Sequence, residues 1–311
     1  MRLVFMGTAQ FAVPSLENLI LSGYDVPLVV TQPDRPAGRG KRLKPPPVKL
    51  LTDKYDLNVV QPVSIRTPDF EQMITDIKPE VIVVVAYGKI LPENILRLPP
   101  LGCINVHGSL LPVYRGAAPV QRALMAGEKT VGVTTMYMDK SMDTGDIILQ
   151  RAVDLEGDED YGGTILKLSH IGADLLLETL EQVEWGINPR VHQDNAHATY
   201  APPLTAGDEL IKWEMKSQSI RDQIRGLSPE PGAYTWLNHD KLKIFRAETV
   251  EEGAAGLPGE VLRIIPHKGF VVATGQGGLL ILEVQKAGKK RIPADEFLRG
   301  SKLREGDRFG R

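Results

Sequence analysis

The sequence predicts an α/β protein with two domains, in which a parallel sheet covered by helices is followed by a small β-barrel. Short apolar runs alternate with helical patterns from Arg2 onward, as expected for a parallel sheet. Later, over 233–285, β-branched and aromatic runs recur at roughly ten-residue spacing without helical patterns between them. A chain of 311 residues also exceeds the usual size of one hydrophobic core.

The elements of the first domain follow from the spacing of its apolar residues. We expect strands at Arg2–Met6, Asp25–Thr31, Val81–Ala86, Cys103–His107, Gly132–Met138 and Ile147–Val153, and helices at 11–23, Pro47–Tyr55, Thr67–Ile77, 92–96, Pro119–Met125 and Gly162–Val183. Thr67 followed by Pro68 is typical of a helix start. The nearly continuous β-branched run from Val81 favours a buried central strand.

A linker and a second domain follow. Residues 189–208 contain prolines and little periodicity, so they are expected to connect a domain over 1–188 to one over 209–311. We expect a helix at Trp213–Leu227 and strands at Ala233–Leu237, Leu242–Arg246, Gly259–Ile265, Gly269–Ala273 and Leu279–Gln285. Short strands in this number indicate a small barrel of the OB-like kind.

Composition excludes several classes of protein. The single cysteine excludes an intrachain disulfide and a cysteine-based zinc site, and no metal is expected. No run approaches the roughly twenty apolar residues of a membrane helix, and the N-terminus lacks a signal-peptide pattern, so we expect a cytoplasmic protein. The turn after the first strand contains only Gly7, and without the G-x-G-x-x-G fingerprint a nicotinamide cofactor is not supported.

The strand expected at Cys103–His107 carries the candidate chemistry. Its period of two places Asn105 and His107 on one face, about 7 Å apart at Cα, where both can reach one polar group. Ile104 and Val106 face the core on the other side. Cys103 shares the face of His107, but a separation of about 13 Å argues against a thiol–imidazole pair, so its role is packing.

Two strand ends are expected to meet at one edge of the sheet. Tyr87 and Gly88 follow one parallel strand and His107 ends the next, and ligands in open α/β sheets bind beyond such carboxyl ends. A small acidic turn, Ser141–Asp146, follows a further strand. From the residues alone, a catalytic edge and a buried strand running into a polar turn both remain open.

Positive charge is concentrated in two places. The segment 32–47 contains several prolines, which exclude a helix or a central strand, so a loop is expected. Its cationic residues are Arg35, Arg39, Lys41, Arg42 and Lys44, and a second cluster on the last turns of the barrel comprises Lys286, Lys289, Lys290 and Arg291. Residues 209–311 carry 18 Lys and Arg against 14 Asp and Glu. A mobile arm for a phosphate backbone and a solvated linker both remain open.

The segment Asn105–Pro112, together with Asp143–Asp146, resembles the 10-formyltetrahydrofolate-dependent formyltransferases. The segments Gln32–Lys41, Val85–Gly88 and Arg115–Pro119 are similar to those of members that act on methionyl-tRNA, and length and domain order agree across essentially the whole chain. The stretch Ala201–Leu204 departs from this pattern because it is richer in proline and less basic.

The resemblance implies a Rossmann-like N-terminal catalytic domain and an OB-like C-terminal tRNA-binding domain. The implied reaction moves the formyl group of 10-formyltetrahydrofolate to the α-amine of methionine on initiator methionyl-tRNA, for translation initiation. Asn105 and His107 would donate to the developing oxyanion, while Asp143 supports His107 and receives the amine proton. The implied folate-binding residues are Tyr87, Gly88, Ser109, Leu110, Leu111 and Pro112. The segment 32–47 and the basic barrel would bind tRNA, and a monomer is expected.

Three other functions are compatible with parts of the sequence. A formyltetrahydrofolate hydrolase would use the same Asn, His and Asp with water as acceptor, and a sugar-nucleotide formyltransferase would share the N-terminal chemistry. A non-catalytic RNA-binding protein would explain the basic segments and leave the Asn–His–Asp combination unused. Product analysis with and without charged tRNA, or competition by a nucleotide sugar, distinguishes these alternatives.

Overall fold

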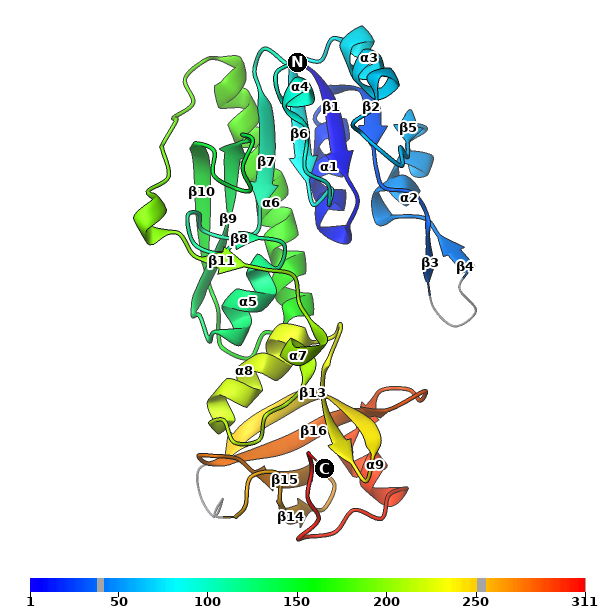
Figure 1. Cartoon of the computed structure of the whole chain (residues 1–311), viewed down its shortest axis with the longest axis vertical. Helices are drawn as coiled ribbons and strands as arrows, with labels where there is room; N and C mark the ends of the chain where they lie inside the picture. The colour runs from blue at the N-terminus through cyan, green and yellow to red at the C-terminus, as the bar shows by residue number, and fades with distance from the viewer. Residues whose placement is uncertain (38–41, 251–255, 311) are drawn as a thin grey trace. The chain divides into compact units, whose positions relative to one another are not determined.

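The structure is a computed structural model that describes residues 1–37, 42–250 and 256–310 (Figure 1). The chain forms two compact units. The first comprises Met1–Pro119, Thr130–Val153 and Ile165–Pro202, and the second comprises Val120–Lys129, Asp154–Thr164 and Pro203–Arg311. The α/β plus β-barrel fold class is confirmed, whereas the domain limits at 188 and 208 stay a prediction.

The elements of the first unit match most of the expected strands and helices. The strands are β1 (Arg2–Gly7), β2 (Asp25–Val30), β3 (Arg35–Ala37), β4 (Arg42–Lys44), β5 (Val59–Val60), β6 (Val81–Val85), β7 (Cys103–His107), β8 (Arg115–Gly116), β9 (Thr130–Tyr137), β10 (Ile147–Asp154) and β11 (Tyr200–Ala201). The helices, some shared with the second unit, are η1 (Gln10–Ala12), α1 (Val13–Leu21), α2 (Pro47–Lys54), α3 (Pro68–Ile77), α4 (Glu93–Leu96), α5 (Pro119–Met125), α6 (Tyr161–Glu184) and η2 (Asn195–His197). The side chain of Thr67 caps α3 as predicted, accepting from the backbone of Phe70.

A seven-stranded sheet of the described residues runs in the order β10–β9–β7–β6–β1–β2–β5. Strands β2, β1, β6 and β7 are parallel, and Val85 pairs with Val106, so the ends of β6 and β7 meet at one edge as predicted. Strand β9 instead runs antiparallel to β7, so the sheet is mixed.

The two faces of the sheet pack against different helices. On one face Cys103 joins a core cluster with Ile82 of β6 and Ile74 of α3. On the other face Val106 lies close to Gly172 of α6, where a Cβ would be 3.0 Å from a Val106 methyl group. The predicted alternation of β7 is therefore confirmed, and Asn105 and His107 share the face of Cys103.

The loop expected over 32–47 is wrong in part, because β3 and β4 form an antiparallel hairpin in which Pro36 pairs with Leu43. In a two-stranded ribbon each strand keeps an unpaired edge, so a proline is tolerated there although a central strand would exclude it. Arg39 and Lys41 lie outside the described residues, as does the side chain of Arg42.

The second unit is an antiparallel barrel with an N-terminal helix. Its elements beyond residue 203 are α7 (Ala206–Glu209), α8 (Ser217–Leu227), β12 (Ala233–Leu237), β13 (Asp240–Val250), β14 (Val261–Ile265), β15 (Gly269–Ala273), β16 (Gly278–Lys286), β17 (Ile292–Pro293) and α9 (Ala294–Arg299). Strand order is β12–β13–β16–β15–β14, with β17 beside β16. The five predicted strands are confirmed, whereas α9 carried no clear sequence signal.

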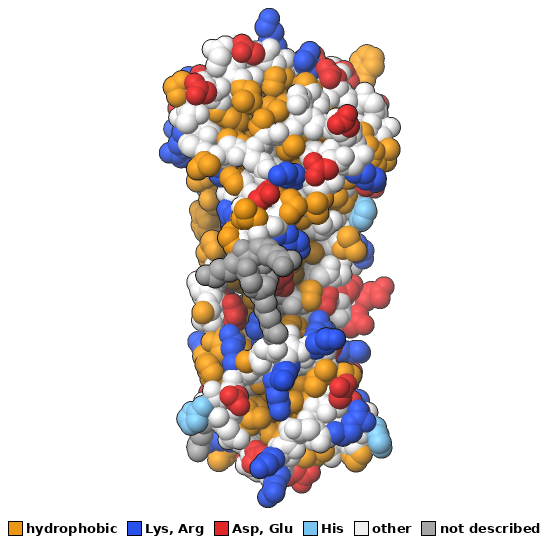
Figure 2. All heavy atoms as spheres, turned by 90° about the vertical axis from the view of Figure 1, so that its right-hand side faces the viewer, with side chains coloured by type: hydrophobic (Ala, Val, Ile, Leu, Met, Phe, Trp, Pro, Cys, Tyr) orange, Lys and Arg blue, Asp and Glu red, His pale blue; other side chains and the backbone are white. Residues whose placement is uncertain are grey.

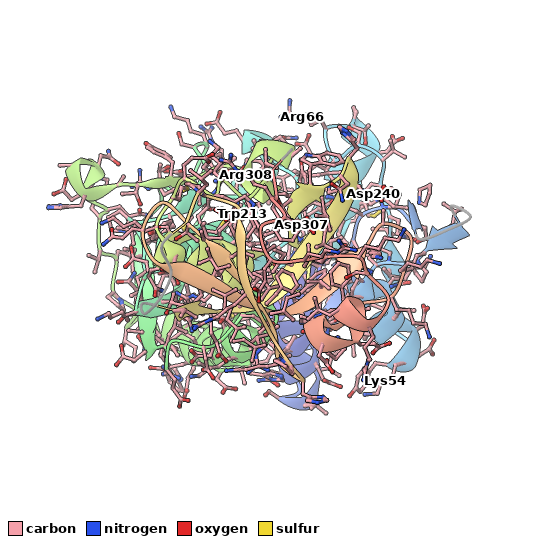
Figure 3. The ribbon with its side chains drawn as sticks, turned by 90° about the horizontal axis from the view of Figure 1, so that it is seen from below. Lys54, Arg66, Trp213, Asp240, Asp307 and Arg308 are labelled. Atoms are coloured by element: carbon pink, nitrogen blue, oxygen red, sulfur yellow. The ribbon has the colours of Figure 1, made fainter. Side chains whose placement is uncertain are left out.

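The C-terminal segment covers the two edges of this barrel. The backbone of Val261 in β14 donates to Asp307, and the backbone of Gly310 donates to Trp236 in β12. The ring of Phe309 stacks on the ring of Trp213, with the two ring centroids 5.8 Å apart. Figure 3 labels Trp213 together with Asp307 and Arg308 of this C-terminal segment. Edge strands expose unpaired backbone groups, and this segment satisfies some of them.

Candidate active site

Strand β7 delivers Asn105 and His107 to the edge of the sheet, as the sequence predicts. Asn105 is only 9% exposed, and its side-chain amide has no hydrogen-bond partner among the described residues. The Asn105 amide is not among the fully buried polar atoms that lack a partner, so it keeps contact with solvent and is open to a ligand that accepts from it. His107, at the next position on the same face, is also buried.

The structure brings His107 and Asp143 together. A carbonyl can only accept, so the ring nitrogen Nε2 donates to the backbone oxygen of Tyr114 at 3.0 Å. The other nitrogen, Nδ1, faces Asp143 Oδ2 at 3.7 Å, too long for a hydrogen bond but close enough for attraction to a protonated ring. Asp143 Oδ2 accepts from the backbone of Gly116 at 2.9 Å, and Oδ1 has no partner among the described residues.

The turn that carries Asp143 is tightly built. The single hydroxyl hydrogen of Thr144 is shared between the two carboxylate oxygens of Asp139, which lie 2.7 and 2.8 Å from the hydroxyl oxygen, and this bond closes the turn. Gly145 lies against strand β9, where a Cβ would be 1.9 Å from the carbonyl oxygen of Tyr137. Asp143 itself has a φ of +56°, a left-handed conformation that side chains disfavour. Such strain persists only where surrounding contacts impose it.

The segment expected to bind folate is braced from strand β9. The hydroxyl of Thr134 donates to the carbonyl of Ser109 at 2.6 Å and accepts from the backbone of Leu111. Ser109 is buried, Leu110 and Pro112 are half-buried, and Leu111 packs in a small cluster with Met136.

Tyr87 and Gly88 lie at the end of β6. The ring of Tyr87 is buried in the core, which raises the pKa of its hydroxyl to about 12. The Tyr87 carbonyl accepts from Gln32 Nε2 at 2.8 Å. Gly88 is exposed, and a Cβ there would meet Gln32 Nε2 at 2.6 Å. The Tyr87 side chain is thus enclosed and its carbonyl accepts from both Thr8 and Gln32, so Gly88 is the exposed residue of this pair.

The basic residues predicted to bind tRNA differ in whether their side chains already contact other groups of the protein. Arg35 donates to the side chain of Gln32. The pKa of Lys89 is lowered, first by the burial of Lys89 and second by the positive charge of Arg35. Lys44 and Lys290 are exposed. Arg291 already pairs with Glu283 and lies over an aromatic ring, so less of its charge is available to a ligand.

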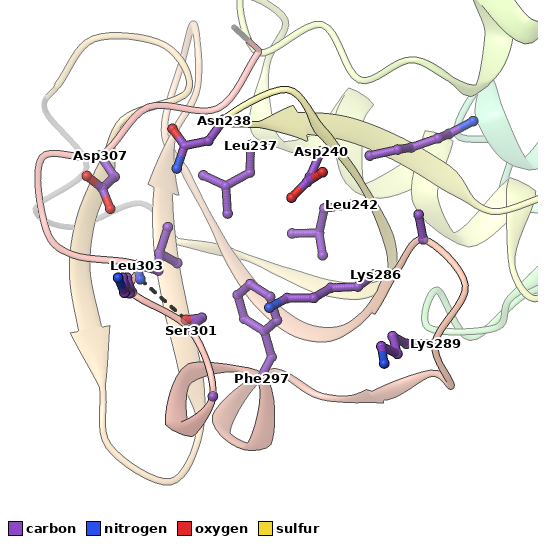
Figure 4. A pocket seen from close by; sticks show the side chains of 14 residues that line it. Leu237, Asn238, Asp240, Leu242, Lys286, Lys289, Phe297, Ser301, Leu303 and Asp307 are labelled. Atoms are coloured by element: carbon purple, nitrogen blue, oxygen red, sulfur yellow. Dashed lines mark hydrogen bonds between the residues drawn. The ribbon is translucent and has the colours of Figure 1, made fainter.

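A pocket of about 360 Å³ opens on the barrel beside the basic cluster (Figure 4). Lys286 extends across it near Phe297, with its nitrogen 5.0 Å from the ring centroid, and Lys289 also lines it. The sequence did not single out Lys241 and Lys302, which belong to the same lining. On the face that Figure 2 shows, Lys and Arg side chains of this unit gather around an apolar area.

Two buried residues near Asp143 were not predicted as site residues. Arg115 occurs in a segment that carried only the family resemblance, and Gln193 fell in the stretch expected as linker. Gln193 donates to the backbone of Asp143, which is 50 positions away in sequence. No local pattern marks such a contact.

Comparisons with known proteins show the family of this chain. Residues 1–180 match the family described as Formyl transferase, and residues 203–302 match Formyl transferase, C-terminal domain. The methionyl-tRNA formyltransferase of Pelotomaculum thermopropionicum is 50% identical over 308 residues, which cover 98% of this chain and 97% of that protein. The chain belongs to the methionyl-tRNA formyltransferase family.

Solved structures show the fold more widely. A methionyl-tRNA formyltransferase from Clostridium thermocellum superposes with a TM-score of 0.56 at 18% identity, covering 80% of this chain and 93% of that one. An N-formyltransferase from Helicobacter canadensis, in complex with folinic acid and dTDP-3-aminofucose, superposes with a TM-score of 0.68 at 18% identity. The match covers 92% of this chain and 99% of that one. The fold is thus shared by a protein named methionyl-tRNA formyltransferase and by an N-formyltransferase bound to folinic acid and dTDP-3-aminofucose.

The described part of this chain contains neither of two further patterns, a membrane-spanning helix and a metal-binding group of side chains. Among residues 1–37, 42–250 and 256–310, no helix is long and apolar enough to cross a membrane. Within the same ranges no group of three or more His, Cys, Asp and Glu side chains is arranged to hold a metal ion.

Proposed function

We propose that this chain transfers the formyl group of 10-formyltetrahydrofolate to the α-amine of methionine on initiator methionyl-tRNA, as an early step of translation initiation in the cytoplasm. The observation that carries the proposal is the agreement with methionyl-tRNA formyltransferases over the full length of both chains. The convergence of His107 and Asp143 at the end of β7 supports it.

Asn105, His107 and Asp143 are assigned the chemistry. When the methionine nitrogen attacks the formyl carbon, a C–N bond forms and the carbonyl oxygen becomes an oxyanion. The unpaired amide of Asn105 stabilises this oxyanion by a hydrogen bond, and a protonated His107, whose ring nitrogens face Tyr114 and Asp143, stabilises it by its charge. Asp143 attracts the His107 ring through Oδ2 and accepts the amine proton at the free Oδ1, directly or through water. Breaking the bond from carbon to the folate N10 then restores the carbonyl, and N10 takes up a proton.

The proposed folate site is formed by Ser109–Pro112 with the backbone of Tyr87 and Gly88. The half-buried side chains of Leu110 and Pro112 supply apolar surface for a pterin, and Gly88 is exposed at the end of β6. For tRNA we propose Arg35, Arg39, Lys41, Arg42 and Lys44 of the segment 32–47, with Lys286, Lys289, Lys290 and Arg291 on the barrel. A monomer suffices for this arrangement, since one chain carries all the proposed groups.

A sugar-nucleotide acceptor is the main competing proposal, because the Helicobacter canadensis enzyme shares the fold. Its 18% identity is far below the 50% identity to the methionyl-tRNA enzyme. The hydrolase alternative leaves the basic hairpin and the barrel without a role.

A direct assay tests the proposal. Purified protein is given 10-formyltetrahydrofolate with initiator methionyl-tRNA, elongator methionyl-tRNA, a dTDP-amino sugar or buffer alone. We expect formylmethionyl-tRNA chiefly from the initiator. Formate release at an equal rate in buffer, or formylation of the sugar alone, would refute it.

A further inference from the structure

The side chain of Gln193 holds the turn that carries Asp143. Gln193 is 1% exposed, and its Nε2 donates to the backbone carbonyls of Asp143 at 2.9 Å and Gly145 at 2.7 Å. Its Oε1 accepts from Arg115 Nε at 3.0 Å and Nη2 at 2.8 Å. An amide has two donors and room for two acceptor bonds, so every one of them is used.

The orientation of this amide is determined by its partners. Arginine can only donate and a carbonyl can only accept, so turning the Gln193 amide over would oppose like groups at all four bonds. Arg115 is itself buried, and its Nη1 donates to Asn195 Oδ1 at 2.9 Å. The planar fork of Arg115 thus fixes the Gln193 oxygen from two directions.

Asp143 is consequently held at both ends. Its backbone carbonyl is bound by Gln193, and its carboxylate is bound by the backbone of Gly116, the residue next to Arg115. The left-handed φ of Asp143 requires such outside contacts, because the turn alone would relax toward an ordinary conformation.

We propose that Gln193, oriented by Arg115, is a positioning residue that sets the place of the Asp143 carboxylate relative to His107. This inference rests on the proposed function, since it gives Asp143 a role in formyl transfer. It adds that Gln193, within the stretch 189–208 expected from sequence to be a linker, supplies part of the active-site framework.

The kinetic test uses Gln193→Met, which keeps length and volume but removes all four hydrogen bonds. A displacement of about 1 Å of a reacting group lowers turnover about 10²-fold, so we expect kcat to fall by about that factor. The KM values for folate and methionyl-tRNA should change less than about twofold, because other residues bind them. Gln193→Glu is the second variant: it retains an acceptor for Arg115 but opposes a carboxylate to two carbonyls, and kcat should fall again.

Combining two substitutions distinguishes a positioning role of Gln193 from a general loss of structure. In an Asp143→Asn background, Gln193→Met should lower kcat no further, because Asp143 no longer contributes what Gln193 positions. An equal fall in both backgrounds would overturn the proposal.

Hydrogen exchange supplies a readout that needs no activity. In Gln193→Met we expect at least about tenfold faster exchange in peptides covering Gly116 and 139–146, since local opening becomes easier. Gln61→Met is the matched control, because Gln61 donates two amide hydrogen bonds elsewhere in the same unit. Unchanged exchange in Gln193→Met overturns the inference, whereas absence of formyl transfer by the unmodified protein would overturn only the proposed function.

Discussion

Replacing Gly145 by alanine should misplace Asp143 by a distance that the structure specifies. A Cβ at this position would be 1.9 Å from the carbonyl oxygen of Tyr137, whereas real Cβ contacts essentially never fall below 3.0 Å. The turn must therefore move by at least the difference, 3.0 − 1.9 = 1.1 Å. The obstacle is strand backbone, so the turn yields rather than the strand. A shift of about 1 Å at a catalytic group costs about 10²-fold in turnover.

The assay measures kcat, both KM values and the midpoint of thermal unfolding. We expect Gly145→Ala to lower kcat about 10²-fold and to reduce stability by roughly 1–3 kcal/mol, the usual cost of overpacking. Gly207→Ala is the control, since its added Cβ would meet only the hydroxyl of Thr205, at an ordinary 3.6 Å. A kcat within twofold of the unmodified protein would refute the reasoning, as would a loss confined to KM.

Three further predictions follow from individual contacts. Asn105→Ala should lower kcat about 10²–10³-fold at saturating substrates by removing one oxyanion donor, and near-normal turnover would exclude that role. The Asp208 carboxyl has its pKa lowered to about 2, chiefly by the hydrogen bond from Arg122, so the pair stabilises the fold above pH 4 and loses this effect as pH falls toward 2. Asp208→Asn should therefore cost about 2 kcal/mol at pH 6 and little near pH 2, as measured by urea unfolding; a pH-independent loss would contradict the assignment. Lys286→Ala with Lys289→Ala should weaken tRNA binding and reduce the slope of log affinity against log salt by about one for each phosphate that these lysines neutralise, and an unchanged slope would show that the pocket does not bind the backbone.

The carboxyl edge of the sheet was predictable because each contribution to it is local. A β-branched run marks β6, the alternation of apolar and polar residues marks β7, and parallel strands must end at one edge. The order of Asn105 and His107 along β7 already places both on one face. The position of Asp143 could not be predicted in the same way. An acidic turn can be a simple surface turn or part of a site, and only its neighbours in the fold distinguish the two.

Contacts between residues that lie far apart in the sequence were not predictable. Gln193 contacts Asp143 at a separation of 50 residues and Arg115 at a separation of 78. Neither contact leaves a periodic trace, because one buried amide and one buried guanidinium look like ordinary polar residues in sequence. The β3–β4 hairpin was missed for a related reason, since proline excludes central strands but not the edges of a ribbon.

The sequence by itself determined most of the longer elements, the fold class and the candidate oxyanion donors, because periodicity and turn chemistry act over a few residues. Only the tertiary structure decided that β9 runs antiparallel to β7, that the C-terminal segment covers the barrel edges, and that a residue after α6 bonds to the turn that carries Asp143. Those outcomes depend on which distant groups satisfy one another's hydrogen bonds when buried, and burial is a property of the folded chain.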